Sequence, residues 1–177
     1  MLMVGVKCAR KNVTMVLDAL VRLRSAGVQV PRTIFVGNLR EDVVPVTTGI
    51  AERGLADYAT ITNYVSDAAM RRVMWSSAAL LFPSMYEGFG MPLVEALASR
   101  TRVLCTRLPT TIAILDKLGT YLAADAGALA LAMRDACQSP RGLPSRLCNE
   151  RLAILGAQNE LQFATLRKWI DEALGTP

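Results

Sequence analysis

The chain has 177 residues, of which 52% are hydrophobic and 20% charged, and its formal net charge at pH 7 is +5. This length and composition are typical of one globular domain with a real core, and they exclude a disordered chain. Histidine is absent, so the chain supplies no histidine general base, no serine–histidine triad and no histidine-ligated metal.

Charge, hydropathy and cysteine spacing indicate which binding partners and which cellular location to expect. The basic residues are scattered and no nucleic-acid motif appears, so a phosphate site on a solvated surface is favoured over a nucleic-acid partner. No apolar stretch is long enough to predict a transmembrane segment, and basic residues follow the first apolar run, unlike in a secretory signal. The cysteines, which have no paired spacing, are Cys8, Cys105, Cys137 and Cys148. Reduced thiols and a cytoplasmic location are therefore expected.

Short apolar runs alternate along the chain with longer stretches of helical period. The apolar runs predict strands at Leu2–Gly5, Thr33–Gly37, Tyr58–Thr62, Ala79–Phe82, Arg102–Thr106 and Thr120–Ala123. Helical spacing predicts helices over Asn12 to Ala26, Asp67–Ser77, Asp125–Cys137, around Ser145–Leu155 and at Leu161–Leu174. Asn12 and Ser66 are expected N-caps, and Gly27 an expected stop. The predicted fold class is therefore α/β, a Rossmann-like doubly wound parallel sheet of about six strands, whose ligand binds beyond the carboxyl ends of the strands.

The segment from Pro83 to Ala98 carries the clearest functional signal. It follows a predicted strand, makes a glycine turn and places Pro92 where a helix would start. Free backbone N–H groups and the positive end of the helix dipole would face one point there, which favours an anion. Glu87 stands just before the turn and Glu95 in the expected first helical turn. Carboxylates repel phosphate and accept hydrogen bonds from hydroxyls, so the arrangement suits a phosphate flanked by sugar rings.

This segment resembles the donor-binding half of the group 1 family of retaining glycosyltransferases, which use two Rossmann-like domains in the GT-B architecture. The family signature is two glutamates separated by seven residues in a Pro-Ser-x-x-Glu-Gly-Phe-Gly-x-Pro context, which Glu87 and Glu95 match. Val4-Gly5, followed after four residues by Arg10-Lys11-Asn12, is similar to the segment whose basic pair holds the donor diphosphate. The resemblance covers about residues 1–137 well.

The resemblance implies a role for each matched residue. Glu87 would be catalytic, contacting the transferred sugar and stabilising positive charge at the anomeric carbon, while Glu95 would bind the ribose hydroxyls. Arg10 and Lys11 would bind the diphosphate. The other implied substrate-binding residues are Tyr64 and Val65, which lie in a turn that reads the nucleotide base, and Gly88, Phe89, Gly90, Met91, Pro92 and Leu93. No metal and no cofactor are expected, and the donor substrate would be a nucleoside-diphosphate sugar.

Plainer interpretations of the same residues stay open at this stage. Arg10 and Lys11 would then only precede a surface helix, and Tyr64 would be a packing residue. Glu87 would be an exposed loop carboxylate, and Glu95 an acid that favours the dipole at a helix start. After the motif, the run from Leu108 to Ile112 departs from the family, where many members carry a glutamate.

The expected function is hexosyl transfer from a sugar nucleotide to a glycan, lipid or other acceptor with retention of configuration, as in polysaccharide biosynthesis. Residues 1–177 would form one donor-binding domain that binds but hardly catalyses alone. The expected partner is an N-terminal acceptor domain or a separate subunit, and any peripheral membrane association would go through that half. The alternatives are a non-catalytic nucleotide-sugar-binding subunit and a sugar-nucleotide epimerase-like domain.

Overall fold

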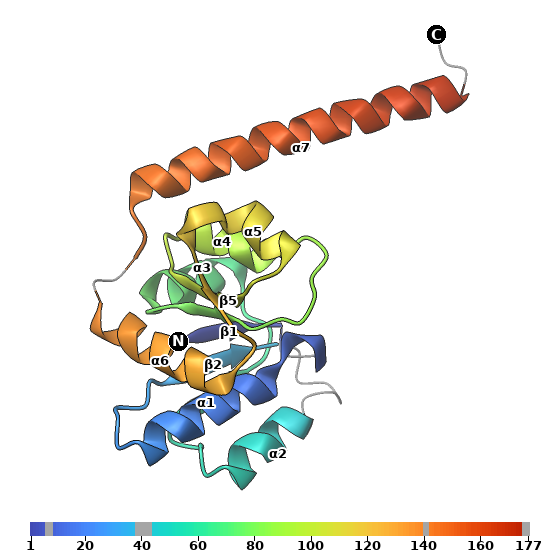
Figure 1. Cartoon of the computed structure of the whole chain (residues 1–177). Coiled ribbons are helices and arrows are strands. Elements are labelled where there is room, and N and C mark those ends of the chain that lie inside the picture. The colour runs from blue at the N-terminus through green and yellow to red at the C-terminus, as the bar shows by residue number, and fades with distance from the viewer. Residues whose placement is uncertain (6–8, 38–43, 140–141, 175–177) are drawn as a thin grey trace.

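The computed structural model describes residues 1–5, 9–37, 44–139 and 142–174, apart from the side chains of residues 44–45 and 161–174. One parallel sheet runs through the described part (Figure 1), and its strand order is β3-β2-β1-β4-β5-β6. Its strands are β1 (Leu2–Val4), β2 (Thr33–Val36), β3 (Ala59–Thr62), β4 (Leu80–Phe82), β5 (Val103–Thr106) and β6 (Gly119–Leu122). Every strand end lies within one residue of its predicted position, so the predicted α/β doubly wound sheet is confirmed.

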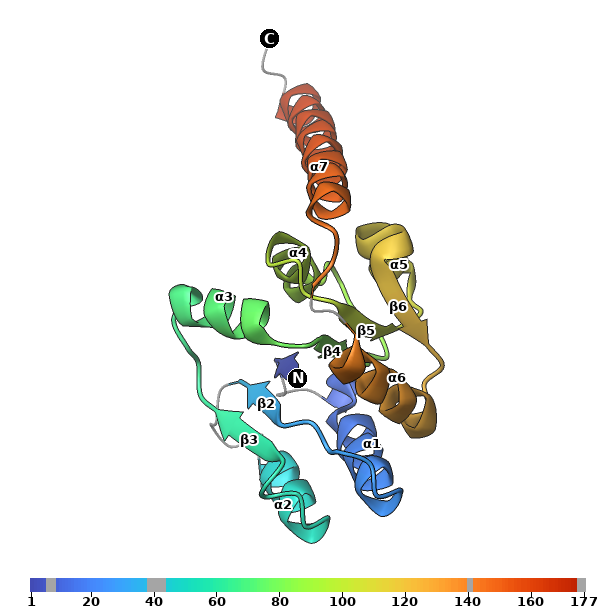
Figure 2. The ribbon, with the colours of Figure 1, turned by 90° about the vertical axis from the view of Figure 1, so that its left-hand side faces the viewer.

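Both faces of the sheet are covered by helices, which explains why the strands are apolar without strict alternation. All residues of β4 and β5 are buried. On one face, Met3 and Phe35 belong to a core with helices α1 (Val13–Ser25) and α6 (Ala126–Gln138). On the other face, Leu2 belongs to a second core with α4 (Met91–Ala98) and α5 (Pro109–Leu115). Figure 2 shows the sheet between these two helical layers.

The other helices are α2 (Val44–Glu52), α3 (Asp67–Ser76) and α7 (Ser145–Leu174), with 3₁₀ turns η1 (Ala9–Lys11) and η2 (Asp116–Leu118). Helices α2 and α5 were not predicted from the sequence. Helix α2 contains proline, threonine and glycine, which are weak helix formers, and its helical form is supported by burial of Val46 and Ile50. Helix α5 spans only seven residues, too few for a clear helical period.

The predicted helix caps are confirmed in position, and one differs in mechanism. Ser66 precedes α3 and accepts a hydrogen bond from the Ala69 N–H at 3.3 Å. Gly27 follows α1 with a φ of 65°, which suits a residue without a Cβ. Asn12 precedes α1 but makes no side-chain cap bond, because its backbone is left-handed (φ 55°) and its amide donates to Met15 Sδ instead.

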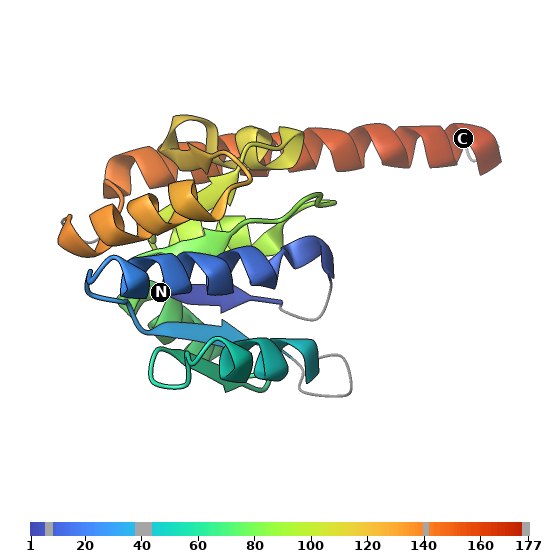
Figure 3. The same ribbon diagram turned by 60° about the horizontal axis from the view of Figure 1, so that its bottom comes forward.

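Helix α7 corrects the prediction of two separate C-terminal helices. It runs unbroken from Ser145 to Leu174, and Figure 3 shows it continuing past the sheet. The segment predicted to break it contains Gly156 as its one strong helix breaker, which costs only about 1 kcal/mol relative to alanine. Leu147, Leu152 and Leu155 pack against the second core. The side chains of the segment predicted as Leu161–Leu174 lie outside the described residues.

Two further expectations concern cysteines and membrane helices. Cys105, Cys137 and Cys148 are free thiols, and Cys8 lies outside the described residues. Among the described residues, no helix combines the length and the apolar composition that a membrane span needs.

Helix α6 offers a matched test of this packing. Leu129 is fully buried in the core that α6 shares with α1, whereas Leu131 is 55% exposed on the same helix. We expect Leu129→Ala to lower the free energy of unfolding by about 2–5 kcal/mol, because it removes buried methyl groups and leaves a cavity. Leu131→Ala is the control and should change it by less than about 0.5 kcal/mol. Urea unfolding of both variants is the measurement, and equal losses would contradict this packing.

Candidate functional site

The strand order brings two loops together at the carboxyl edge of the sheet. Strands β1 and β4 are neighbours, and the chain connections run in opposite directions on either side of this pair. Such a reversal point is where open parallel sheets bind ligands. Turn η1 follows β1, and the glycine turn of residues 83–90 follows β4. The two loops are joined by a hydrogen bond from the Met85 N–H to the Arg10 carbonyl at 2.8 Å.

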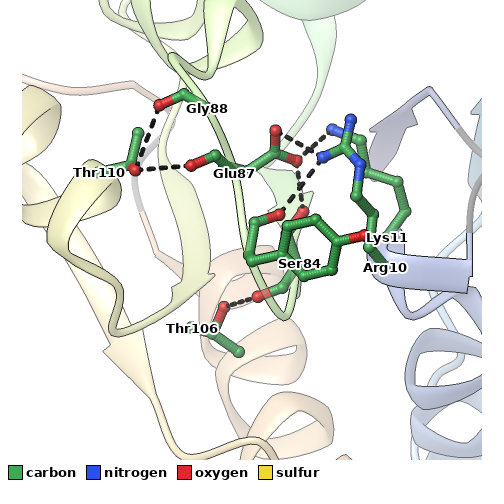
Figure 4. Close-up of polar contacts among 8 residues, drawn as sticks. Arg10, Lys11, Ser84, Glu87, Gly88, Thr106 and Thr110 are labelled. Carbon is green, nitrogen blue, oxygen red and sulfur yellow. Dashed lines mark hydrogen bonds and ion pairs between the residues drawn. The ribbon is translucent and has the colours of Figure 1, made fainter.

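A cluster of charged side chains forms where these loops meet (Figure 4). The Glu87 carboxylate lies 2.6 Å from Lys11 Nζ and 2.7 Å from an Arg10 guanidinium nitrogen. The Ser84 hydroxyl donates to the same carboxylate at 2.9 Å. Only 6% of the Glu87 side chain is exposed. The alternative interpretation of Glu87 as an exposed loop carboxylate is therefore excluded, because three donors from two loops enclose it.

The Lys11 side chain is almost fully buried on its way to Glu87. It is 9% exposed, and its ammonium lies 4.7 Å from the centroid of the Phe82 ring, a cation–π distance. Gly5 lies beside it: a Cβ there would come into contact with Lys11 Cε at 3.4 Å, and it is the φ of 79° that favours glycine at this position. Lys11 is thus no ordinary surface residue ahead of a helix. Arg10 remains more open, with 29% of its side chain exposed.

The balance of contacts keeps Glu87 ionised. Desolvation by burial acts to raise the pKa of Glu87, but hydrogen bonds from Lys11, Arg10 and Ser84 outweigh it. The pKa therefore lies below its ordinary value of 4.5. One carboxylate then faces two cations, so the three side chains carry a net charge of +1 together.

The glycine turn presents backbone N–H groups beside this cluster. Gly90 precedes α4 with a φ of 81°, and a Cβ there would lie 3.0 Å from Leu93 Cδ1. The Leu93 N–H is already bonded to the Gly90 carbonyl at 2.8 Å, and Pro92 has no N–H. Among the described residues, no protein acceptor is found for the N–H groups of Gly88, Phe89 and Gly90. These N–H groups, which lie just before the first residue of α4, are available to donate to an anion.

Three further predicted residues lie in the turn after β3 and on α4. Tyr64 is 81% exposed, which does not support a packing role, while Val65 is partly buried against the second core. Glu95 is exposed and lines a hollow of about 420 Å³ between α3 and α4, together with Asp67 and Met70. Glu95 is the fifth residue of α4, so its prediction in the first helical turn, with a favourable dipole effect there, is wrong.

Hydroxyl groups supply the part of the site that the sequence analysis missed. The Thr110 hydroxyl donates to the backbone carbonyls of Glu87 and Gly88, and the Thr106 hydroxyl donates to the carbonyl of Ser84. The available signal for Thr110 was the segment from Leu108 to Ile112 after β5, which the sequence analysis interprets only as a departure from the family. Among the described residues, no three His, Cys, Asp or Glu side chains form a group that could hold a metal ion.

Comparison with known families and curated proteins identifies relatives of this chain. The family model described as "Glycosyl transferases group 1" matches residues 1–151. MMP alpha-(1->4)-mannosyltransferase of Mycolicibacterium hassiacum is 36% identical over 63 residues, covering 36% of this chain and 15% of that protein. The O-antigen chain mannosyltransferase RfbU of Salmonella typhimurium is 32% identical over 76 residues, covering 43% of this chain and 22% of that protein.

Solved structures share the fold. Sucrose-phosphate synthase from Thermosynechococcus elongatus matches with a TM-score of 0.77 and 22% identity, over 97% of this chain and 45% of that one. Anabaena HepE in complex with UDP and glucose matches with a TM-score of 0.71 and 17% identity, over 99% of this chain and 48% of that one. The chain therefore spans less than half the length of each of these proteins.

The buried carboxylate makes the stability of the protein depend on pH. Because folding lowers the pKa of Glu87, its ion pairs stabilise the fold fully above pH 4.5, and this contribution is lost as the pH falls below 4.5 through the lower folded value. We expect the free energy of unfolding to fall less steeply on acidification in Glu87→Gln than in the unchanged chain. Urea unfolding at a series of pH values measures this.

The control for this experiment is Glu150→Gln, which removes an exposed pair with Arg146 on α7. Exposed pairs contribute little, so this variant should follow the unchanged chain. Superimposable pH profiles for Glu87→Gln and the unchanged chain would contradict the stabilising role of the cluster.

Proposed function

This chain belongs to the group 1 glycosyltransferases, and from that premise we propose that it is a donor-binding domain for a nucleoside-diphosphate sugar. The sugar would be transferred to a glycan, lipid or other acceptor with retention of configuration. The observation that carries this proposal is the Arg10–Lys11–Glu87 cluster beside the N–H groups of the glycine turn, which have no protein acceptor in the described part of the chain.

The diphosphate would bind by exchange for the Glu87 carboxylate. Arg10 and Lys11 bring two positive charges to one point, and Glu87 neutralises only one of them. A diphosphate carries more negative charge than a carboxylate and has more acceptor oxygens, so it competes well for both cations. The N–H groups of Gly88, Phe89 and Gly90, with the dipole of α4, would receive the remaining phosphate oxygens.

The exchange would also prepare Glu87 for its catalytic role. Once both cations turn to phosphate, the Glu87 carboxylate keeps its bond from Ser84 and gains freedom toward the sugar. There it would stabilise the positive charge that develops at the anomeric carbon. The negative charge that develops on the leaving diphosphate would be stabilised by the fixed cations and dipoles, without a requirement for metal.

The hollow between α3 and α4 would hold the nucleoside. Glu95 lines it and is exposed, as a ribose-binding carboxylate must be, and Asp67, which lines it from α3, lies two residues after Val65. The curated relatives are named for transfer of mannose, and the HepE structure contains UDP and glucose. These names support a hexosyl donor and make mannose the first sugar to test.

An acceptor-binding half would complete the enzyme. The solved relatives are about twice as long as this chain, which supports a further domain or subunit as the partner. That partner would bring the acceptor to the carboxyl edge of the sheet.

Nucleoside diphosphates should bind this chain in the presence of EDTA as well as of magnesium. Titration calorimetry with UDP, GDP and ADP is the measurement. Lys11→Ala should weaken binding by about 1.5–3 kcal/mol, roughly ten- to a hundredfold in Kd, because a charged hydrogen bond is lost. Lys117→Ala is the control, because Lys117 lies just before β6, at the opposite edge of the sheet. Binding that needs magnesium, or equal losses in the two variants, would count against the proposal.

Glu95→Ala should also weaken binding of nucleoside diphosphates, roughly tenfold or more, since each ribose hydroxyl loses a charged acceptor. The free energy of unfolding of this variant should hardly change, because the Glu95 side chain is exposed. Glu52→Ala, at the end of α2, is the matched control. The same calorimetry measures both variants, and an unchanged Kd in Glu95→Ala would remove Glu95 from the site.

A further inference from the structure

Thr110 contacts the backbone of the glycine turn from outside it. It lies at the start of α5, and its hydroxyl is 3.0 Å from the Glu87 carbonyl oxygen and 3.4 Å from the Gly88 carbonyl oxygen. Both are acceptors, so the one hydroxyl proton is shared between two successive peptide groups. Figure 4 shows Thr110 on the side of Glu87 away from Arg10 and Lys11.

This contact sets the direction of two N–H groups. In a planar trans peptide the C=O and the next N–H point in opposite directions. A hydroxyl that holds the carbonyls of Glu87 and Gly88 on one side therefore turns the N–H groups of Gly88 and Phe89 to the other side. These are two of the groups without a protein acceptor among the described residues.

The turn needs such an external anchor. Gly88 is exposed, and a Cβ added to it would meet nothing within 4 Å, so neighbouring atoms do not restrict it sterically. Glycine also has the widest backbone freedom of all residues. The Glu87 side chain is tied to Arg10 and Lys11, which are the groups that the proposed function gives to phosphate. The Thr110 bonds do not involve those cations and persist through the exchange.

Thr110 is itself firmly placed. Pro109 precedes it and has a fixed φ at the start of α5. The next residue, Thr111, is fully buried, accepts from the Leu108 N–H at 2.9 Å and lies 2.9 Å from the Thr106 carbonyl oxygen. The start of α5 is thus bonded to the end of β5. Thr110 is fixed by this arrangement, and its hydroxyl bonds in turn fix the glycine turn.

We propose that Thr110 is a positioning residue for phosphate binding: its hydroxyl aims the Gly88 and Phe89 N–H groups at the diphosphate of the donor. This inference rests on the proposed function, since it assigns a further determinant of the same site. Thr110 touches no phosphate. It acts through the two peptide groups that it holds.

The test compares Thr110→Val, which keeps the shape and loses the hydroxyl, with Thr110→Ser, which keeps the hydroxyl. Calorimetry gives the Kd of each variant for UDP, GDP and ADP, and for the corresponding nucleosides without phosphate. We expect Thr110→Val to weaken diphosphate binding about five- to tenfold and to leave nucleoside binding unchanged, with recovery in Thr110→Ser. Thr120→Val is the control, because Thr120 is exposed on β6.

Amide NMR of the unchanged chain gives a readout that does not depend on any variant. Addition of the nucleoside diphosphate should shift the Gly88 and Phe89 amide resonances strongly. Diphosphate binding as tight in Thr110→Val as in the unchanged chain would overturn the inference. So would a failure of Thr110→Ser to recover binding, or absence of both amide shifts while the diphosphate binds. If the unchanged chain binds no nucleoside diphosphate, the proposed function falls, and this inference with it.

Discussion

The enclosure of the Glu87 carboxylate by Lys11, Arg10 and Ser84 is the interaction on which the rest of the site depends. A charge that is 6% exposed would be costly without partners, because desolvation penalises the ionised form. Here two cations and a hydroxyl offset that cost. The partners come from loops 76 residues apart in the sequence, so the same contacts tie turn η1 to the glycine turn. The cations that hold the two loops together are therefore the same cations that would bind the diphosphate.

The site combines two kinds of contact, which would respond differently to phosphate binding. The ion pairs of Glu87 are exchangeable, because phosphate offers Arg10 and Lys11 the same kind of acceptor with more charge. The hydroxyl bonds of Ser84, Thr106 and Thr110 are made to atoms that no phosphate would replace. A site of this design keeps its shape while its central ion pairs are exchanged. The bonds of Thr106 and Thr110 to backbone carbonyls are neutral and contribute about 1 kcal/mol each, which is sufficient for that task, since they orient groups and do not compete with the ligand.

The sheet explains why these contacts fall at one edge. Strands β1 and β4 are buried on both faces by the helical layers, so polar groups can be presented only at the strand ends, and ligands of such sheets bind at the carboxyl ends. Gly5 and Gly90 supply the positive φ values at the two places where the chain turns away from those ends. The neighbouring pair β4 and β5 then brings the threonines after β5 alongside the glycine turn. The site thus draws on three successive strand ends.

Much of this could be predicted from the sequence because it depends on local patterns. Apolar runs without alternation indicated all six strands, and the Glu87-to-Glu95 segment indicated the anion site and the family. Helix α2 could not be predicted, because its proline, threonine and glycine residues are weak helix formers and burial of Val46 and Ile50 decides its form. Helix α7 was predicted as two helices, around Ser145–Leu155 and at Leu161–Leu174, whereas the structure has one unbroken helix, because Gly156 between them costs only about 1 kcal/mol relative to alanine.

The sequence by itself determined the order of strands along the chain, the glycine turn and the residue types of the site, since each follows from local periodicity and backbone preference. Only the tertiary structure decided that Glu87 is enclosed and that Thr110 holds the turn. Both depend on β1 and β5 lying on either side of β4, which is a long-range pairing. Local sequence carries no record of which strands become neighbours, and the electrostatic environment of a carboxylate is set by those neighbours.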